Sequence, residues 1–200
     1  MVRSMLIFGG GGFVGGNLAA IANQKGREVT VANQTIKPGL DFANWISLDI
    51  TNMEAVQEAI DQVTPDVVVN LAAMADIDIA ERERQQTWKI NVDGARNVAQ
   101  CCAVAGIRHI YFSSDAVFSG EQDRYAEESL PAPLNFYGQT KAEAEKAVLA
   151  VHPKSVVVRI SLVLGFPVTR GNSFFAGLTA KLKTGTQIFV PEDEIRTPVD

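Results

Sequence analysis

The chain has 200 residues, 46% of them hydrophobic, and a formal net charge of −5 at pH 7. This is enough apolar content for one α/β domain with its own core. Acidic and basic residues are interspersed, which disfavours nucleic acid as a partner. No apolar stretch reaches the roughly 20 residues that a membrane-spanning helix needs, so we expect no membrane partner either.

The two cysteines, Cys101 and Cys102, are adjacent in an Ala-rich helical pattern. Neighbours on a helix do not share a face, so neither a disulfide nor a metal site is expected at this pair. We predict two half-buried free thiols. The apolar run at 5–8 is too short for a signal peptide, and together with the free thiols it favours a reducing, cytoplasmic setting.

Strand and helix patterns alternate along the chain. The strands are short continuous apolar runs, typical of strands that are buried on both faces. Thr51 or Asn52 is expected to cap the second helix, and Gly106 to end the third. In chain order we predict strand 4–8, helix 13–24, strand 28–32, strand 45–48, helix 52–63, strand 66–70, helix 86–105, strand 108–112, helix 136–151 and strand 155–160. After Gly165 the pattern is looser, with a helix at 171–183 and a short strand at 187–190.

This alternation predicts an α/β fold with a Rossmann-type, doubly wound parallel sheet and helices on both faces. In such sheets, ligands bind beyond the carboxyl ends of the strands. Residues that carry chemistry are therefore expected directly after the strands.

A glycine-rich turn separates the first strand from the first helix. Its Gly9, Gly12 and Gly15 fit the spacing G-x-x-G-x-x-G, a variant of the dinucleotide fingerprint. The first glycine permits a tight turn, the second lets the backbone approach a pyrophosphate, and the third lets the helix pack close to the strand. The helix start at Phe13 and Val14 offers free N–H groups and a positive dipole end to the phosphates. The turn predicts a bound nicotinamide dinucleotide.

The choice between NAD and NADP depends on the end of the second strand. An acidic residue there would hold the ribose hydroxyls of NAD, but the sequence has Asn33 and Gln34. Without that carboxylate the main repulsion against a 2′-phosphate is absent, although Lys37 is the nearest cation and no Arg is close. We expect NADP(H) or NAD(H), with a slight preference for NADP(H).

Two further segments follow strands at the same edge and are candidate cofactor contacts. Asp49 and Ile50 follow the third strand, where Asp49 either accepts from the adenine amino group or caps the next helix. Leu71, Ala72 and Ala73 follow the fourth strand, where small residues either leave room for a flat cofactor or pack in the core.

Tyr137 and Lys141 are four residues apart at the start of a helix, so they lie on one face. A phenol has a pKa of about 10 and is a poor acid–base group at neutral pH. A nearby ammonium group favours the phenolate and is expected to lower the pKa of Tyr137. Lys141 can also reach the ribose of a bound nicotinamide. The pair predicts proton transfer to or from a carbonyl oxygen as hydride is exchanged.

Ser113 and Ser114 follow the predicted fifth strand, at the edge where the site should be. Ser114 either donates to the substrate oxygen and stabilises its developing charge, or serves as a helix cap or turn hydroxyl. The order of glycine loop, strand-end serine pair and Tyr-x-x-x-Lys favours the first interpretation.

With these residues, the chain resembles the extended short-chain dehydrogenases/reductases, and among them the sugar-nucleotide reductases of the dTDP-4-dehydrorhamnose reductase type. The resemblance runs over essentially the whole chain. It is carried by the three glycines of the turn and by segments 70–73, 91–94, 113–118, 131–137 with Lys141, and 196–198.

The resemblance implies that Ser114 polarises the substrate carbonyl, Tyr137 is the acid–base group, and Lys141 orients the nicotinamide ribose and tunes Tyr137. Asn91 matches the family's Asn in the long helix, which helps to hold the active site through water and backbone bonds; alternatively it is a polar residue that kinks the helix. Ala116 replaces an aromatic residue often found there, so the identity of the sugar stays open.

The implied function is NAD(P)H-dependent reduction of a keto-sugar nucleotide. One alternative is an NAD-dependent sugar-nucleotide epimerase, which uses the same Ser, Tyr and Lys. A second is a non-catalytic regulatory subunit that resembles the regulatory subunit of methionine adenosyltransferase. Dehydration is disfavoured, because Asp115 follows the strand-end Ser without an adjoining Glu.

The resemblance also implies a homodimer formed through helices 86–105 and 136–151, whose Ala-rich faces permit close packing. Residues 1–165 would form the NAD(P)-binding Rossmann domain with the catalytic residues, and residues 166–200 would begin a small substrate-binding region. Family members continue further, so we expect this chain to be truncated.

Overall fold

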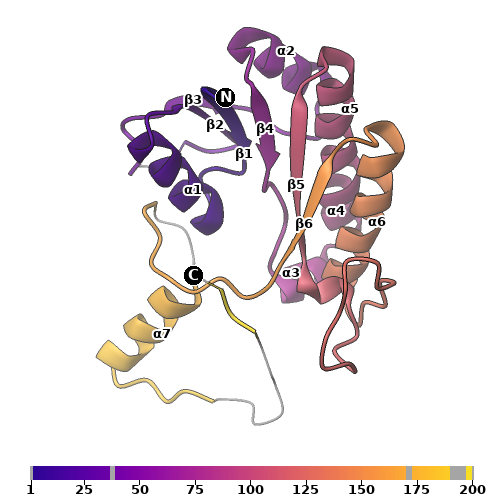
Figure 1. Ribbon diagram of the computed structural model, residues 1–200. Helices are drawn as coiled ribbons and strands as arrows, with labels where there is room; N and C mark the ends of the chain where they lie inside the picture. Colours follow the sequence, from indigo (N-terminus) through magenta and orange to yellow (C-terminus); the bar gives the residue numbers. More distant parts are fainter. Residues whose placement is uncertain (1, 37–38, 170–172, 190–196, 200) are drawn as a thin grey trace.

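The computed structural model describes residues 2–36, 39–169, 173–189 and 197–199. Within them, parallel strands form one six-stranded sheet in the order β3-β2-β1-β4-β5-β6 (Figure 1). The strands are β1 (Ser4–Phe8), β2 (Glu28–Asn33), β3 (Asn44–Ser47), β4 (Val67–Asn70), β5 (Arg108–Ser114) and β6 (Val156–Ile160). The helices are α1 (Phe13–Gln24), α2 (Met53–Val63), α3 (Ile77–Arg82), α4 (Arg84–Trp88), α5 (Ala95–Ala105), α6 (Phe136–Val151) and α7 (Phe174–Lys183). The predicted doubly wound sheet is confirmed, because the strand order reverses direction next to β1.

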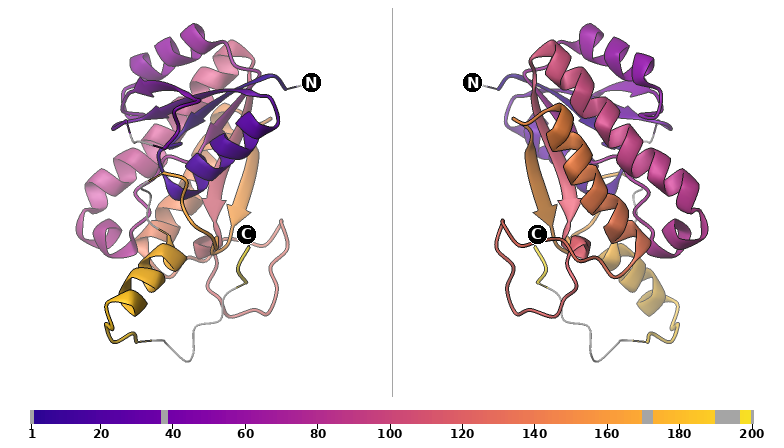
Figure 2. Two further views of the ribbon diagram at one scale, coloured as in Figure 1. Left: turned by 90° about the vertical axis from the view of Figure 1, so that its left-hand side faces the viewer. Right: turned by 90° about the vertical axis from the view of Figure 1, so that its right-hand side faces the viewer.

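Different helices cover the two faces of the sheet (Figure 2). Along β1, Leu6 and Phe8 pack into a core that includes residues of α2 and α5, whereas Ile7 packs into a core that includes residues of α1. This alternation follows from the two-residue period of a strand. On the α5 side, Tyr111 of β5 packs with Ala99 of α5 and a buried alanine of α6.

The predicted helix 86–105 differs from the observed one in two ways. It begins at Arg84, and a π-helical segment, Lys89–Gly94, interrupts it between α4 and α5. A π-helix holds one extra residue per turn and often marks a functional position. The short helix α3 was not predicted from the sequence.

The ends of several strands also differ from the prediction. Strand β2 extends to Asn33 and β5 extends to Ser114, because these polar residues still pair with neighbouring strands, Asn33 with Ser47 and Ser114 with Ile160. A polar residue at a strand end gives no apolar signal, although its backbone completes the ladder.

The C-terminal part is only partly as predicted. Helix α7 covers the later residues of the predicted helix 171–183, whose residues 171 and 172 lie outside the described ranges. Residues 187–189 do not form the predicted strand, and Val190 lies outside the described ranges. Instead, a single parallel bridge pairs Val163 with Val199.

The two cysteines are more buried than predicted. Cys101 and Cys102 are both free and both fully buried in one core cluster. Helix α5 packs against both α2 and α6, so adjacent positions on different faces of the helix are both covered. Burial raises the pKa of the Cys102 thiol to about 12, with the neighbouring Cys101 adding to the shift. Within the described ranges, no helix combines the length and apolar composition needed to cross a membrane.

Candidate active site

The glycine-rich turn lies where the carboxyl ends of β1 and β4 meet. Gly9 has a φ angle of +77°, and a Cβ at this position would stand 2.6 Å from the backbone N of Ala72. A Cβ on Gly15 would stand 2.6 Å from the carbonyl oxygen of Gly9. Both positions therefore require glycine, the first for the turn and the second for close packing of α1 against the strand.

Gly12 is the N-cap residue of α1, and its N–H donates to the carbonyl of Gly9 at 3.0 Å. A Cβ on Gly12 would have one close neighbour, this same carbonyl at 3.2 Å, so the backbone there is open on its other sides. The first turn of α1 carries no acidic residue. The N–H groups of Phe13 and Val14 thus lie at an uncompensated positive helix end, which suits a pyrophosphate.

The segment after β4 lies against the glycine-rich turn. The N–H of Leu71 donates to the carbonyl of Phe8 at 2.9 Å, and the N–H of Ala72 donates to Asn70 Oδ1 at 3.1 Å. Ala73 follows in the same half-buried segment. The structure thus brings this segment next to the turn, as the predicted cofactor contacts require.

Asn33 lies on the other side of the turn. It is the last residue of β2, and a Cβ on Gly11 would stand 3.2 Å from the Asn33 side chain. The Asn33 amide donates to the carbonyl of Thr35 at 3.0 Å. This is the position from which a residue can contact the adenosine ribose. Lys37 lies outside the described ranges.

Asp49 does not cap the helix that follows it. Its carboxylate accepts from the N–H of Thr51 at 2.9 Å and from Gln34 Nε2 at 2.9 Å. Asn52 caps α2 instead, by accepting from the N–H of Ala55. Partial burial works to raise the pKa of Asp49, but the hydrogen bonds from Thr51 and Gln34 outweigh it, and the pKa is lowered overall. The carboxylate remains ionised at the β2–β3 edge.

Ile50 is buried in the core. A Cβ on Gly94 of the π-helical segment would stand 2.7 Å from the Ile50 side chain, so Gly94 leaves room for it. The carbonyl of Ile50 accepts from Asn97 Nδ2 at 3.1 Å. The Ile50 side chain therefore packs against the π-helical segment, in the core cluster that also holds Val56 of α2 and Val98 of α5.

Ser114 ends β5 and is buried. Its hydroxyl oxygen accepts from the N–H of Ala116 at 3.2 Å, and its hydroxyl donates to Asp115 Oδ1 at 3.2 Å. It therefore caps the 3₁₀ turn Asp115–Val117, which is the alternative considered from the sequence. It also lies close enough to the Tyr137 side chain to lower the pKa of that phenol, so the capping role does not remove it from the site.

The start of α6 holds Tyr137 against this turn. Asn135 caps the helix by accepting from the N–H of Gly138 at 2.8 Å. Gly138 lies so close to the 3₁₀ turn that a Cβ there would collide with the carbonyl oxygen of Ala116. This contact places the half-buried Tyr137 beside Ser114.

Lys141 is buried one turn further along α6. Its Nζ donates to the carbonyl of Phe112 at 2.6 Å and stands 4.3 Å from the centre of the Tyr111 ring. Burial lowers the pKa of Lys141 to about 7, against the field of Glu145, which raises it. The ammonium is therefore held between β5 and α6 with few polar contacts.

The predicted lowering of the Tyr137 pKa is not found in the structure. Burial raises the pKa of Tyr137, the hydrogen bond with Ser114 lowers it less, and the charge of Asp115 raises it further. Desolvation disfavours the charged phenolate, and the spacing of Tyr137 and Lys141 in the sequence does not reveal this effect. In this structure the phenol is held in its protonated form, as a proton donor must be.

Asn91 lies where the long helix is interrupted, and its side chain reaches two other segments. It lies in the π-helical segment, and its side chain holds the segment after β4, with Oδ1 accepting from Met74 N at 2.8 Å and Nδ2 donating to Met74 O at 3.1 Å. Nδ2 also donates to Thr140 Oγ1 of α6 at 3.0 Å. Asn91 thus connects three segments of the site.

Three residues near Lys141 were missed by the sequence reading: Tyr111, Glu145 and Arg159. Glu145 lies four residues after Lys141, and a charged Arg159 inside a Val-rich strand is a signal that something must pair with it. The two form an ion pair at 2.7 Å.

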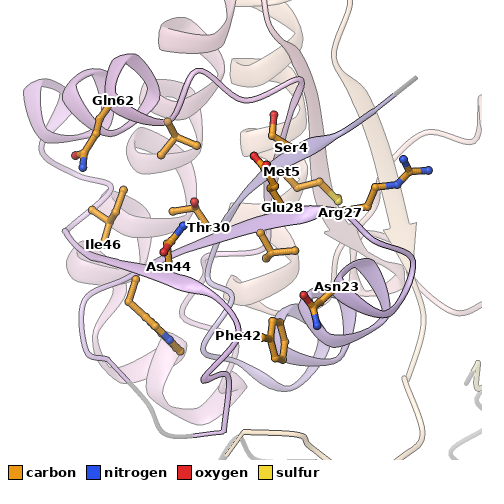
Figure 3. Close-up of a pocket in the computed structure, with 13 residues that line it drawn as sticks. Ser4, Met5, Asn23, Arg27, Glu28, Thr30, Phe42, Asn44, Ile46 and Gln62 are labelled. Atoms are coloured by element: carbon orange, nitrogen blue, oxygen red, sulfur yellow. The ribbon is translucent and has the colours of Figure 1, made fainter.

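A pocket of about 630 Å³ lies elsewhere (Figure 3). Its wall includes Ser4, Glu28 and Asn44, which are the first residues of β1, β2 and β3. It therefore opens at the amino ends of the strands, opposite the glycine-rich turn, and is not part of the candidate site.

Comparison with known proteins identifies the family. Residues 3–200 match the family model of the RmlD substrate-binding domain. The chain belongs to this family. A dTDP-4-dehydrorhamnose reductase of Aggregatibacter actinomycetemcomitans is 35% identical over 199 residues, which cover 97% of this chain and 62% of the relative. The chain thus spans about three fifths of that relative's length.

A solved structure and a second relative are also similar to this chain. A crystal structure of dTDP-4-dehydrorhamnose reductase from Bacillus anthracis in complex with NADP has a TM-score of 0.79 at 31% identity, covering 94% of this chain and 62% of that one. Methionine adenosyltransferase 2 subunit beta of Pongo abelii is 39% identical over 118 residues, which cover 59% of this chain and 35% of the relative. The RmlD family assignment confirms the predicted resemblance.

Proposed function

We propose that this chain carries the site of an NAD(P)H-dependent reductase that acts on the keto group of a sugar nucleotide. The observation that carries the proposal is that Tyr137 lies beside Ser114, with Lys141 one turn further along the same helix, at the sheet edge that also holds the glycine-rich turn. The relatives named as dTDP-4-dehydrorhamnose reductases support the substrate class.

The residues present fit the dinucleotide. Gly9 and Gly15 leave no room for side chains, and the backbone around Gly12 is open beside an uncompensated helix start. When bound, the cofactor supplies the hydride for the substrate carbonyl carbon. Phe13 and Val14 would hold its pyrophosphate, and Asn33 its adenosine ribose.

The chain's own residues would stabilise and protonate the carbonyl oxygen of the substrate. Ser114 donates a hydrogen bond to it and stabilises the negative charge that develops there. Tyr137 transfers its phenolic proton to the same oxygen, so the carbonyl becomes an alcohol and Tyr137 becomes a phenolate. Lys141 would hold the nicotinamide ribose, and its ammonium form would stabilise the transient phenolate.

We propose NADP(H) rather than NAD(H) as the preferred cofactor. Asn33 brings no carboxylate to the end of β2, and the Bacillus anthracis reductase was crystallised with NADP. Titration with both reduced cofactors tests this preference, and NADH binding at least about tenfold tighter than NADPH would contradict it.

Replacing Tyr137 by Phe removes the proton donor and leaves the ring. We expect the rate of NADPH oxidation with a dTDP-4-keto sugar to fall by about two to four orders of magnitude, because general acid catalysis contributes that much. NADPH affinity should change little. Absorbance at the nicotinamide band measures the rate, and unchanged turnover in the variant would refute the mechanism.

A second candidate is a subunit without catalysis, which the similarity to methionine adenosyltransferase 2 subunit beta favours. It predicts NADPH binding without turnover of any keto-sugar nucleotide, in both the parent chain and the Tyr137 variant. An epimerase would instead retain NAD through gel filtration.

We further propose a division at residue 165, with a dinucleotide-binding part before it and the start of a substrate-binding part after it. The sheet and the candidate catalytic residues all lie before Gly165, and α7 lies after it. The chain spans 62% of the length of the Aggregatibacter relative.

A further inference from the structure

Arg159 and Glu145 form a two-pronged ion pair beside the candidate site, with Glu145 buried and Arg159 partly buried. Arg159 Nε stands 3.0 Å from Glu145 Oε1, and Arg159 Nη2 stands 2.7 Å from Oε2. Glu145 is 5% exposed. A paired guanidinium and carboxylate in this geometry are fixed in orientation, and either charge alone would be costly to bury.

Arg159 also contacts residues 118–131, the first part of the connection between the 3₁₀ turn and α6, called the 118–131 loop below. Its Nη1 donates to the carbonyl of Glu127 at 3.1 Å and to the carbonyl of Ser129 at 3.4 Å. Its guanidinium lies 5.0 Å from the centre of the Phe118 ring. The loop projects at the carboxyl end of β5 (Figure 1). One side chain of β6 thus anchors the loop at three points.

Glu145 acts on the candidate site through Lys141. The two residues are one helical turn apart on α6, so they share a face. A buried ammonium needs a counter-charge, and the field of Glu145 raises the pKa of Lys141 against the larger effect of burial.

We propose that Arg159 and Glu145 are positioning residues that couple the placement of the 118–131 loop to the charge of Lys141. When the loop moves, Arg159 neutralises Glu145 to a different extent, and Glu145 then stabilises the Lys141 ammonium more or less strongly. The proposal rests on the proposed function in one respect, namely that Lys141 takes part in the reaction. The titratable or charged groups around Lys141 come from four elements: Tyr137 and Glu145 of α6, Tyr111 of β5, Asp115 of the 3₁₀ turn, and Arg159 of β6.

The loop half of the proposal is tested by trypsin, because Arg124 in the loop is exposed. Removing the anchor with Arg159→Gln should speed cleavage after Arg124 about fivefold, since local opening governs the rate. Arg159→Lys keeps the positive charge without the two-pronged guanidinium geometry, so it should give a smaller increase in the cleavage rate. The matched control is Lys146→Gln, which breaks an exposed ion pair with Glu143 on the same helix and should leave cleavage unchanged.

The Lys141 half is tested by NMR titration of chains labelled with ¹³C at lysine Cε, with the Lys141 signal assigned by its loss in Lys141→Met. Glu145→Gln removes the favourable field and leaves Arg159⁺ unpaired, so the pKa of Lys141 should fall by about one unit. Arg159→Gln leaves Glu145⁻ less neutralised, so the pKa of Lys141 should rise. Opposite shifts are the signature of electrostatic coupling, because simple structural damage would move both variants in the same direction.

The double variant Glu145→Gln, Arg159→Gln leaves neither partner of the ion pair as a lone charge, so it serves if a single variant fails to fold. It should keep the fast cleavage after Arg124. Normal cleavage in a folded Arg159→Gln or double variant, or Lys141 shifts in one direction only, would overturn the proposal. Neither readout needs cofactor or turnover. If the parent chain binds no NADPH, the proposed function is contradicted, but the coupling between the 118–131 loop and Lys141 can still be measured.

Discussion

Gly138 is the residue that brings the candidate proton donor to the strand-end serine. Its lack of a Cβ lets the first turn of α6 contact the carbonyl of Ala116, and Tyr137 then meets Ser114. From the sequence, Tyr137 and Lys141 could be found by their spacing. The spacing could not reveal how tightly Gly138 packs, since that depends on a turn twenty residues earlier in the chain.

The Gly138→Ala variant should be destabilised by about 3 kcal/mol, because overpacking against backbone cannot be relieved by a rotamer change. Urea unfolding measures the change. The matched control is Gly177→Ala in α7, where a Cβ would meet nothing within 4 Å. There the helix propensity of Ala should give a gain of about 0.5–1 kcal/mol. Equal effects at the two glycines would contradict the packing described for Gly138.

The Tyr137 pKa shows the same limit of sequence reasoning. Two side chains four residues apart on a helix are neighbours, so a lowered phenol pKa was expected. The structure turns Lys141 towards the carbonyl of Phe112 and buries Tyr137, so that desolvation decides the direction. Side-chain burial is a property of tertiary packing, which a local spacing does not encode.

At the scale of elements, boundaries were predictable where the chain carries its own stop signals. Helices α1 and α6 both have the predicted bounds. Helix α1 begins directly after the glycine-rich turn, and α6 ends shortly before Pro153. Helix α3 is six residues long, too short for a helical period to emerge. It still matters, because Glu81 of α3 accepts from the N–H of Phe136, the first residue of α6, at 2.7 Å.

The π-helical segment is the element that depends most on one side chain. Replacing Asn91 by Leu should cost about 3 kcal/mol, because the partly buried N–H and carbonyl of Met74 lose their partner. Gln100→Leu on the exposed face of α5 is the matched control and should change stability by less than about 0.5 kcal/mol. Thermal unfolding of both variants decides, and a small loss for Asn91→Leu would show that Asn91 is not structural.

At the scale of the whole molecule, the sheet order was predictable because repeated βα units with buried strands allow few topologies. The return of the chain after β6 was not. There, the Thr169 hydroxyl donates to the carbonyl of Gly11 at 3.1 Å, across 158 positions in sequence. A contact at that separation leaves no pattern in a single sequence, although it braces the turn that would bind the cofactor.

We propose that the chain pairs as a homodimer through α4, α5 and the π-helical segment between them, and through α6. Trp88, Val104 and Leu149 are exposed apolar residues on these helices. Light scattering should give twice the 21.6 kDa of one chain. Leu149→Asp should lower the measured mass to that of the monomer, because it places a charge in an apolar interface. Leu182→Asp on α7 is the matched control and should leave the dimer intact. A parent chain that is monomeric at micromolar concentration would contradict the proposal.

The central claim is that one site at the carboxyl edge of the sheet holds the dinucleotide and the catalytic residues together. A crystal structure of the chain with NADPH tests it most directly. We expect the pyrophosphate at the N–H groups of residues 12–14, and the nicotinamide ring beside Tyr137, with its ribose in reach of Lys141. Density for NADPH in the pocket at the amino ends of β1 to β3, or a nicotinamide ring remote from Tyr137, would contradict it.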